Sequence, residues 1–209
     1  MIVKICGIKT LDTLICCANN KVNFFGMIFY NKSPRYINIK DAILLQNEAK
    51  KLSINGVGVF VDEKISTINE YIRELGLKFI QLHGNESNNY ISELKKNRIN
   101  IIKKISIKEK TDLYDINNYN LADYFLFDYK PNNGELPGGN AKSFDWKIIQ
   151  ELKIEKPWFL SGGIKIENIQ EIKSKIKPYG IDLSSGVEKE LGIKDNGVIN
   201  NFMENLKYA

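Results

Sequence analysis

The segment "PWFLSGGIKIENIQEIKSKIKPYGIDLSSG" (residues 157–186) carries the pattern that decides the fold. It begins and ends with short apolar runs, at 157–162 and 180–185, which are typical of buried strands. The part between them has the length of a helix and interleaves lysine and glutamate with isoleucine, as a surface helix does. A strand, a helix and a second strand in this order predict one βαβ unit of a parallel sheet.

The same alternation extends through the rest of the chain. Six further apolar runs lie at 2–6, 24–29, 56–61, 78–83, 99–105 and 123–128. Helical spacing recurs between the runs, as in Ile43, Leu44, Asn47 and Leu52 and in Ile68, Tyr71, Ile72 and Leu75. Eight strands in 209 residues leave about 26 residues per unit, close to the lower limit for a (β/α)8 barrel.

We therefore predict the α/β class and a single-domain (β/α)8 TIM barrel over residues 1–209. A doubly wound open sheet stays possible, since periodicity does not show closure, but eight evenly spaced units favour the barrel.

Composition narrows the range of partners. The net charge is +5, but the lysines alternate with glutamates instead of forming one basic block, so we expect no nucleic-acid partner and an anionic small substrate. Three cysteines and one histidine provide neither a disulfide framework nor a zinc pattern, so no metal is expected. No signal-like segment and no apolar run near 18 residues is present, which predicts a cytoplasmic protein without a membrane partner.

Polar residues and glycines stand where the predicted strands end, and active sites of (β/α)8 barrels lie at those ends. The side chains with usable chemistry there are Cys6, Arg35, Gln81, His83, Asp128 and Asp182. The segment 129–143, rich in Gly, Pro and Asn, follows the sixth strand on the same face, and a loop of that length is usually functional or disordered.

The turns "SGG" (161–163) and "SSG" (184–186) follow the last two strands. Glycines there let backbone N–H groups approach a phosphate, and barrels frequently bind phosphate with these two loops. Each turn could also be only a tight connection, but the pair predicts a phosphate site.

Cys6 and Asp128 can act as a base and an acid that face each other across the barrel mouth. A thiol is a useful base near neutral pH only where local positive charge lowers its pKa. Cys6 could instead be core filler and Asp128 a helix cap. Arg35, held behind a proline, could bind a carboxylate or be an exposed turn residue. These residues alone indicate a barrel enzyme that moves protons on a phosphorylated small molecule.

Several motifs together resemble the phosphoribosylanthranilate isomerase family of tryptophan biosynthesis. They are "VKICGIK" (3–9), "GMIFYNKSPRY" (26–36), "VGVFVDE" (57–63), "IQLHGNE" (80–86), "LFD" (126–128), "PGGNAKSFDW" (137–146), "FLSGGI" (159–164) and "IDLSSGVE" (181–188). They occur in the family's order and cover essentially the whole chain.

The resemblance implies an Amadori rearrangement without a cofactor. Cys6 matches the general base that removes the proton from C2 of the sugar, and Asp128 matches the general acid that protonates the ring oxygen. Arg35 matches the residue that binds the anthranilate carboxylate, and Asp182 lies at a polar contact to the anthranilate part.

Further substrate contacts are expected at Gln81 and His83. The phosphate is expected on Gly139, Gly162, Gly163, Ser184, Ser185 and Gly186. The family reads "GGTGK" or "GGSGK" after the sixth strand, whereas this chain has Asn140 and Ala141 after Gly139, so we expect weaker phosphate contacts there. We expect a monomer or a homodimer.

Other barrels fit less well. Indole-glycerol-phosphate synthase is longer and uses a catalytic lysine, and ribulose-phosphate epimerase needs more metal-binding histidines than His83. A broader sugar isomerase would need an acidic residue in place of Cys6. A non-catalytic barrel that binds phosphate or anthranilate is the alternative from another class; it would lack Cys6 or Asp128, and both are present.

Overall fold

A computed structural model of the chain describes residues 1–132, 134–135, 137–139, 142–150 and 154–208. Its centre is a closed barrel of eight parallel strands in sequential order. They are β1 (Ile2–Cys6), β2 (Phe24–Ile28), β3 (Asn55–Phe60), β4 (Phe79–Leu82), β5 (Asn100–Ile107), β6 (Tyr124–Tyr129), β7 (Trp158–Leu160) and β8 (Gly180–Leu183). Closure is made by β1 and β8, where Val3 pairs with Ile181, so the predicted barrel is confirmed and the open sheet is excluded.

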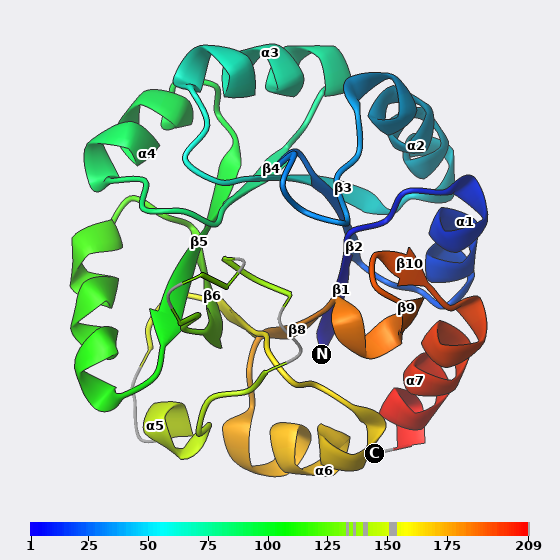
Figure 1. The fold of residues 1–209 in the computed structure, drawn as a ribbon, viewed down its shortest axis with the longest axis vertical. Helices are drawn as coiled ribbons and strands as arrows, with labels where there is room; N and C mark the ends of the chain where they lie inside the picture. The colour runs from blue at the N-terminus through cyan, green and yellow to red at the C-terminus, as the bar shows by residue number, and fades with distance from the viewer. Residues whose placement is uncertain (133, 136, 140–141, 151–153, 209) are drawn as a thin grey trace.

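Helical segments form a ring around the barrel (Figure 1). They are α1 (Leu11–Asn19), α2 (Ile39–Leu52), α3 (Ile65–Leu75), α4 (Asn88–Lys95), the 3-10 helix η1 (Lys110–Tyr119), α5 (Lys147–Gln150), η2 (Ile166–Asn168), α6 (Ile169–Glu171), the π-helical η3 (Ile172–Ile176) and α7 (Asn196–Tyr208). A short 3-10 helix, η4 (Ser185–Val187), lies inside the ring next to β8 and β1 (Figure 1). No helix in the described part of the chain has both the length and the apolar character needed to span a membrane.

Two apolar layers hold the ring and barrel together. Inside the barrel, Phe24, Val57, Ile102, Leu126 and Phe159 form one buried cluster, against which Ile2, Phe79 and Tyr124 pack. A larger cluster fills the space between the strands and the helices. Because alternate strand residues face inward, the interior of β1 changes from Ile2 to Lys4 and then to Cys6 toward the carboxyl end. The barrel interior is thus apolar at one end and polar at the other.

The buried faces of two helices test the helical patterns. Ile68, Ile72 and Leu75 of α3 are buried, as their spacing predicts. In α2 the expected contribution of Leu44 is wrong, because this side chain is 59% exposed. The buried face of α2 is instead formed by Ala42, Leu45, Gln46 and Ala49. The i, i+3, i+4 and i+7 stripe of this helix includes two alanines, which are weak apolar signals.

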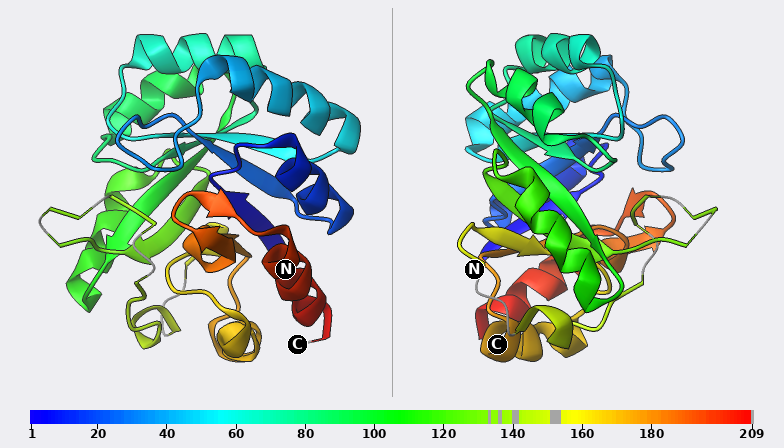
Figure 2. Two further views of the ribbon diagram at one scale, coloured as in Figure 1. Left: turned by 45° about the vertical axis from the view of Figure 1, so that its right-hand side comes forward. Right: turned by 90° about the vertical axis from the view of Figure 1, so that its left-hand side faces the viewer.

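After β8 the chain forms a two-stranded antiparallel hairpin, which the sequence patterns did not predict. It consists of β9 (Glu188–Glu190) and β10 (Ile193–Lys194). Its turn contains Gly192 with φ +81°, a backbone conformation that favours glycine. Figure 2 shows the hairpin and the described part of the loop after β6 extending from the same end of the barrel. That end is the carboxyl end of the strands, where the polar interior lies.

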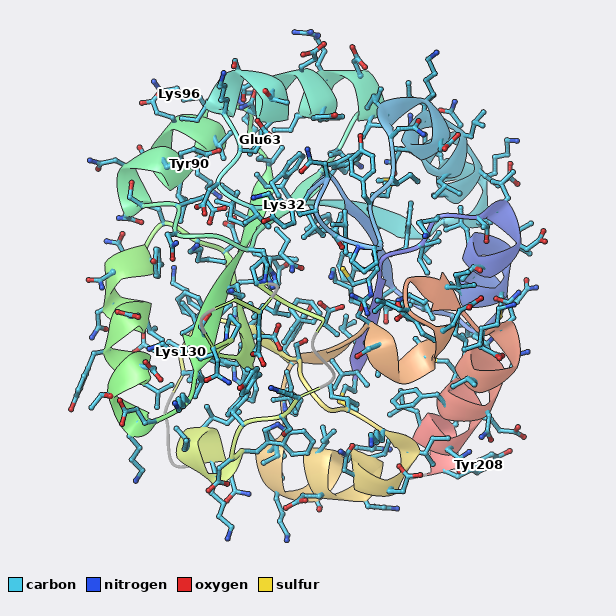
Figure 3. The ribbon with its side chains drawn as sticks, in the orientation of Figure 1. Lys32, Glu63, Tyr90, Lys96, Lys130 and Tyr208 are labelled. Atoms are coloured by element: carbon cyan, nitrogen blue, oxygen red, sulfur yellow. The ribbon has the colours of Figure 1, made fainter. Side chains whose placement is uncertain are left out.

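Contacts at the periphery connect helices of the ring to loops that follow the strands. The Tyr90 hydroxyl on α4 donates to the Glu63 carbonyl in the loop before α3. Lys130, just after β6, forms an ion pair with Asp112 of η1. The sticks of Figure 3 place Lys96 and Tyr208 farther out, on the outer rim.

Candidate active site

Two adjoining cavities open at the carboxyl end of the strands. The first is lined by residues that include Gly139, Gly162, Gly163, Ser184, Ser185 and Gly186. The second is lined by residues that include Cys6, Arg35, Gln81 and His83. Both cavities reach Asp128 and Asp182, which therefore stand at their junction. All twelve residues that the sequence placed in a site are brought together here.

The first cavity has the features of an anion pocket. Gly162 and Gly163 have φ +82° and +68°, so the chain turns there in a conformation that other residues adopt at a cost. A Cβ at Gly186 would lie 2.6 Å from the Ile164 carbonyl, so the two backbones approach as closely as glycine allows. Lys142 and Lys165 add positive side chains to the lining. Backbone amides next to lysines suit a phosphate.

Cys6 lies at the end of β1 and is 6% exposed. Its neighbour across the sheet is Gly26, and a Cβ there would lie 2.7 Å from the Cys6 Sγ. The absence of a side chain at Gly26 thus makes room for the thiol.

The charges around Cys6 oppose one another. Burial and the Asp182 carboxylate raise the pKa of the Cys6 thiol, whereas Lys4 and Lys194 lower it. Burial is the largest effect, so the net shift of this pKa is upward. The thiol is therefore protonated at rest, and the lowered pKa that would suit a base is not found. Lys4 Nζ forms a buried ion pair with Asp182 Oδ2 at 2.8 Å, so the nearest cation is already shared with a carboxylate.

Asp128 ends the inward face of β6 with its side chain buried. Its Oδ1 accepts a hydrogen bond from the Tyr129 N–H at 2.9 Å. Burial raises the pKa of Asp128 to about 6, although Lys104 acts in the opposite direction. A carboxyl group with this pKa keeps a useful protonated fraction near neutral pH, which suits a general acid.

His83 is a neutral donor next to Asp128. Its Nε2 lies 3.2 Å from the Pro137 carbonyl, which only accepts, so Nε2 must carry the proton. Its Nδ1 then accepts from Gln81 Nε2 at 2.8 Å. Burial lowers the pKa of His83 well below its usual value, with further lowering by Lys104. Asp128 Oδ2 is 3.7 Å from His83 Nε2, beyond direct hydrogen bonding.

Arg35 is buried, not an exposed turn residue. Its Nε and one terminal nitrogen donate to the two Glu188 carboxylate oxygens at 2.7 and 2.9 Å. The other terminal nitrogen, NH1, faces Gly139, where a Cβ would lie only 2.3 Å away. One edge of the guanidinium is therefore held by the protein, and the other side points toward the cavity lining.

The sequence patterns did not predict several polar residues in or next to the site. Lys4 and Glu188 lie inside the quoted motifs, and Ser161 and Lys194 lie in or near the late-strand turns. A lysine between apolar strand residues, two positions before Cys6, was a usable signal for Lys4. Asn140 and Ala141, on which the expectation of weaker phosphate binding rests, lie outside the described residues.

The described residues contain no group of three or more His, Cys, Asp or Glu side chains placed to hold a metal ion. Cys6, Cys16 and Cys17 are free thiols.

Comparisons with known proteins agree with one another. The family model described as N-(5'phosphoribosyl)anthranilate (PRA) isomerase matches residues 3–205. The N-(5'-phosphoribosyl)anthranilate isomerase of Mesorhizobium japonicum is 36% identical over 99% of this chain and 95% of its own length. That of Brucella canis is 38% identical over 97% of this chain and 92% of its own.

Solved structures give the same result. Phosphoribosyl anthranilate isomerase from Thermotoga maritima superposes with a TM-score of 0.89 at 32% identity, covering 100% of both chains. A structure of the isomerase in complex with reduced 1-(o-carboxyphenylamino)-1-deoxyribulose 5-phosphate gives a TM-score of 0.84 at 30% identity, again over 100% of both chains.

Proposed function

The chain belongs to the N-(5'-phosphoribosyl)anthranilate isomerase family, and from this membership we propose how its own residues carry out the reaction. The protein is an isomerase of tryptophan biosynthesis that converts N-(5'-phosphoribosyl)anthranilate into 1-(2-carboxyphenylamino)-1-deoxyribulose 5-phosphate. The observation that carries the residue assignment is the junction of the two cavities, where Asp128 is shared and Cys6 lines the adjoining wall.

Asp128 is the proposed general acid. It donates its proton to the ring oxygen of the ribose, the C1–O bond breaks, and an iminium forms between C1 and the anthranilate nitrogen. The pKa of about 6 supports this role, because the buried carboxyl group holds its proton into the range where ordinary aspartates are ionised.

Cys6 is the proposed general base. Its thiolate removes the proton from C2, and the electron pair of that C–H bond forms the C1–C2 double bond of an enolamine. The C2 hydroxyl then loses its proton while C1 gains one, which yields the ketone. The raised pKa of Cys6 means that the thiolate must form as positive charge develops on the iminium, with help from Lys4 and Lys194. The substrate supplies its own electron sink, so the proposal requires no cofactor.

The remaining lining residues bind and orient the substrate in this proposal. The NH1 side of Arg35 takes the anthranilate carboxylate, and the neutral His83 ring contacts the substrate from the wall of the same cavity. Asp182 Oδ1 and Gln81 Oε1 are buried acceptors without a hydrogen-bond partner among the described residues, which suits them to the substrate's N–H and hydroxyl groups. The phosphate lies on the glycine-lined turns, at Gly139, Gly162, Gly163, Ser184, Ser185 and Gly186.

The proposal extends to the protein's surroundings. Residues 1–209 form one barrel domain that works in the cytoplasm on a phosphorylated small molecule, without a nucleic-acid or membrane partner. A structure of monomers generated from the dimeric isomerase of Thermotoga maritima matches at 31% identity and a TM-score of 0.84, over 100% of both chains. Both forms therefore exist for that relative, and we propose a monomer or a homodimer here.

The assignment is tested with substrate made in situ from anthranilate and phosphoribosyl pyrophosphate, following the loss of its fluorescence. Cys6→Ser and Asp128→Asn are each expected to lower kcat by about 10²–10⁴-fold. Cys16→Ser is the matched control, because Cys16 is a free thiol on α1 outside both cavities, and it should retain the parent's kcat.

Each outcome has one meaning. Full activity in folded Cys6→Ser or Asp128→Asn would refute the assignment of that residue. A folded parent that binds the reduced product analogue without turnover would identify a non-catalytic barrel instead.

A further inference from the structure

The hairpin β9–β10 provides a carboxylate whose hydrogen bonds converge on Arg35. The side chain of Glu188 is buried. It accepts hydrogen bonds from two nitrogens of Arg35, from Lys194 Nζ at 2.6 Å and from the Gly192 N–H at 3.1 Å. Burial alone would raise the pKa of Glu188, but the hydrogen bonds from Arg35 and Lys194 outweigh this effect and hold that pKa at about 2. Glu188 is therefore ionised and fully engaged throughout the physiological range.

The geometry selects one orientation of the guanidinium. A bidentate pair uses the Nε edge of Arg35 and fixes its plane, because both nitrogens must remain in line with the two oxygens. NH1 is then directed toward Gly139, in the lining of the second cavity. Without Glu188, rotation about the long side chain of Arg35 would present either edge.

The charges of this group favour an anionic ligand. Arg35 and Lys194 are positive and Glu188 is negative, so the three side chains carry one net positive charge in a buried place. Lys194 also donates to the Ser184 carbonyl at 3.0 Å, and the Ser184 hydroxyl donates to the Cys6 carbonyl at 3.2 Å. The hairpin thus ties Arg35 to the strand that ends in Cys6.

We propose that Glu188 is a positioning residue that determines specificity for a carboxylate on the substrate's aromatic ring, by holding Arg35 with its NH1 toward the cavity. This inference rests on the proposed carboxylate-binding role of Arg35 and extends it to a residue that does not itself touch the substrate. Glu188 acts through orientation: its own charge would repel the carboxylate, and only the guanidinium it holds attracts it.

The test compares two ligands that differ by the carboxylate. Dissociation constants are measured for reduced 1-(2-carboxyphenylamino)-1-deoxyribulose 5-phosphate and for its counterpart made from aniline, which lacks the carboxyl group. The parent is expected to prefer the carboxylated ligand by about 10- to 100-fold, the value of charged hydrogen bonds in a buried site. Glu188→Gln is expected to remove most of this preference while leaving the affinity for the aniline ligand unchanged.

A second variant, Glu188→Asp, keeps the proposal testable if Glu188→Gln does not fold. Glu188→Asp keeps the charge, but its shorter side chain cannot reach both Arg35 nitrogens and Lys194, so the preference should fall here too. Glu86→Gln is the matched control, because Glu86 forms an equally buried ion pair with Lys103 at 2.6 Å and lines neither of the two cavities. It should lower stability and keep the parent's preference.

The outcomes separate the two proposals. If the parent shows no preference, or if Arg35→Met keeps it, the role proposed for Arg35 is wrong. If Arg35→Met abolishes the preference but folded Glu188→Gln and Glu188→Asp keep it or increase it, the positioning role of Glu188 is wrong. An equal loss of affinity for both ligands in the Glu188 variants would also overturn it, since a merely structural role predicts that result.

Discussion

Lys4 and Asp182 form a buried ion pair, with Nζ 2.8 Å from Oδ2. The two residues lie on the neighbouring strands β1 and β8, and Lys4 stands two residues before Cys6 along β1. The pair gives the interior below the thiol one cation and one anion in contact. Three charged groups act on Cys6: Lys4 and Lys194 favour its thiolate, and Asp182 disfavours it. The balance at this point sets how readily the proposed base loses its proton.

Replacing Lys4 with methionine is expected to move the activity profile to higher pH. The cation lowers the pKa of Cys6, so its removal raises that pKa further, and the basic limb of kcat/KM should shift to higher pH. The measurement is kcat/KM against pH. Lys103→Met is the control, since it also breaks a buried ion pair, with Glu86. Both variants should lose about 3–5 kcal/mol of stability, but only Lys4→Met should shift the profile.

Asp128→Asn is expected to stabilise the fold above neutral pH. Burial raises the pKa of Asp128 from 3.8 to about 6, so the folded state binds its proton more tightly than the unfolded state. Below pH 3.8 both states are protonated and no difference exists. As the pH rises from 3.8 to about 6 and beyond, the free energy of unfolding of the parent falls by about 3 kcal/mol in total.

Urea midpoints from pH 4 to pH 8 check this expectation. The variant and the parent should converge at the acid end and differ most at pH 8. A variant less stable than the parent at pH 8 would contradict the assignment of a destabilised, catalytically tuned carboxyl group.

Gly26→Ala is expected to displace the thiol, because the new Cβ would lie 2.7 Å from Cys6 Sγ. We expect kcat to fall by about tenfold or more, since a small misplacement of a reacting group is costly. Gly58→Ala is the control: its Cβ would meet Leu77 and Phe60 instead, which affects packing away from the site. Equal kcat in Gly26→Ala and the parent would show that the position of Cys6 does not limit the reaction.

Gly139→Ala is expected to raise KM by disturbing Arg35. Gly139 has φ +74°, and its Cβ would lie 2.3 Å from Arg35 NH1. Gly134 in the same loop has φ +88° with nothing near its Cβ position, so Gly134→Ala causes the same backbone strain of about 1 kcal/mol without the clash. Steady-state kinetics should show a raised KM only for Gly139→Ala. Equal KM values in the two variants would refute the steric effect on Arg35.

The strands were predictable because parallel strands buried on both faces are continuous apolar runs. The expected runs at 2–6 and 180–185 correspond to β1 and β8, and only the ends differ by a residue or two. The hairpin β9–β10 was not predictable in this way. Its sequence, "EKELGIK" at 188–194, is mostly polar, and its strands are held by a turn glycine, by an ion pair within the hairpin and by one to the distant Arg35.

The site was predictable as a set of residues and less so as a set of interactions. Alternation along a strand explains why Cys6 and Asp128 reach the same end of the barrel. The ion pair of Arg35 with Glu188 joins residues 153 positions apart, and no local pattern in the sequence indicates it. The upward shift of the Cys6 pKa likewise depends on burial, which outweighs the cations that the sequence shows nearby.

The closure of the barrel has a consequence for synthesis of the protein. Lys4 and Asp182 are 178 positions apart in the chain, and they meet only when β8 pairs with β1. A chain still emerging from the ribosome therefore carries Cys6 and Lys4 on an open sheet edge, before Asp182 has joined them. The set of charges that acts on Cys6 is therefore complete only after the last strand has paired with the first.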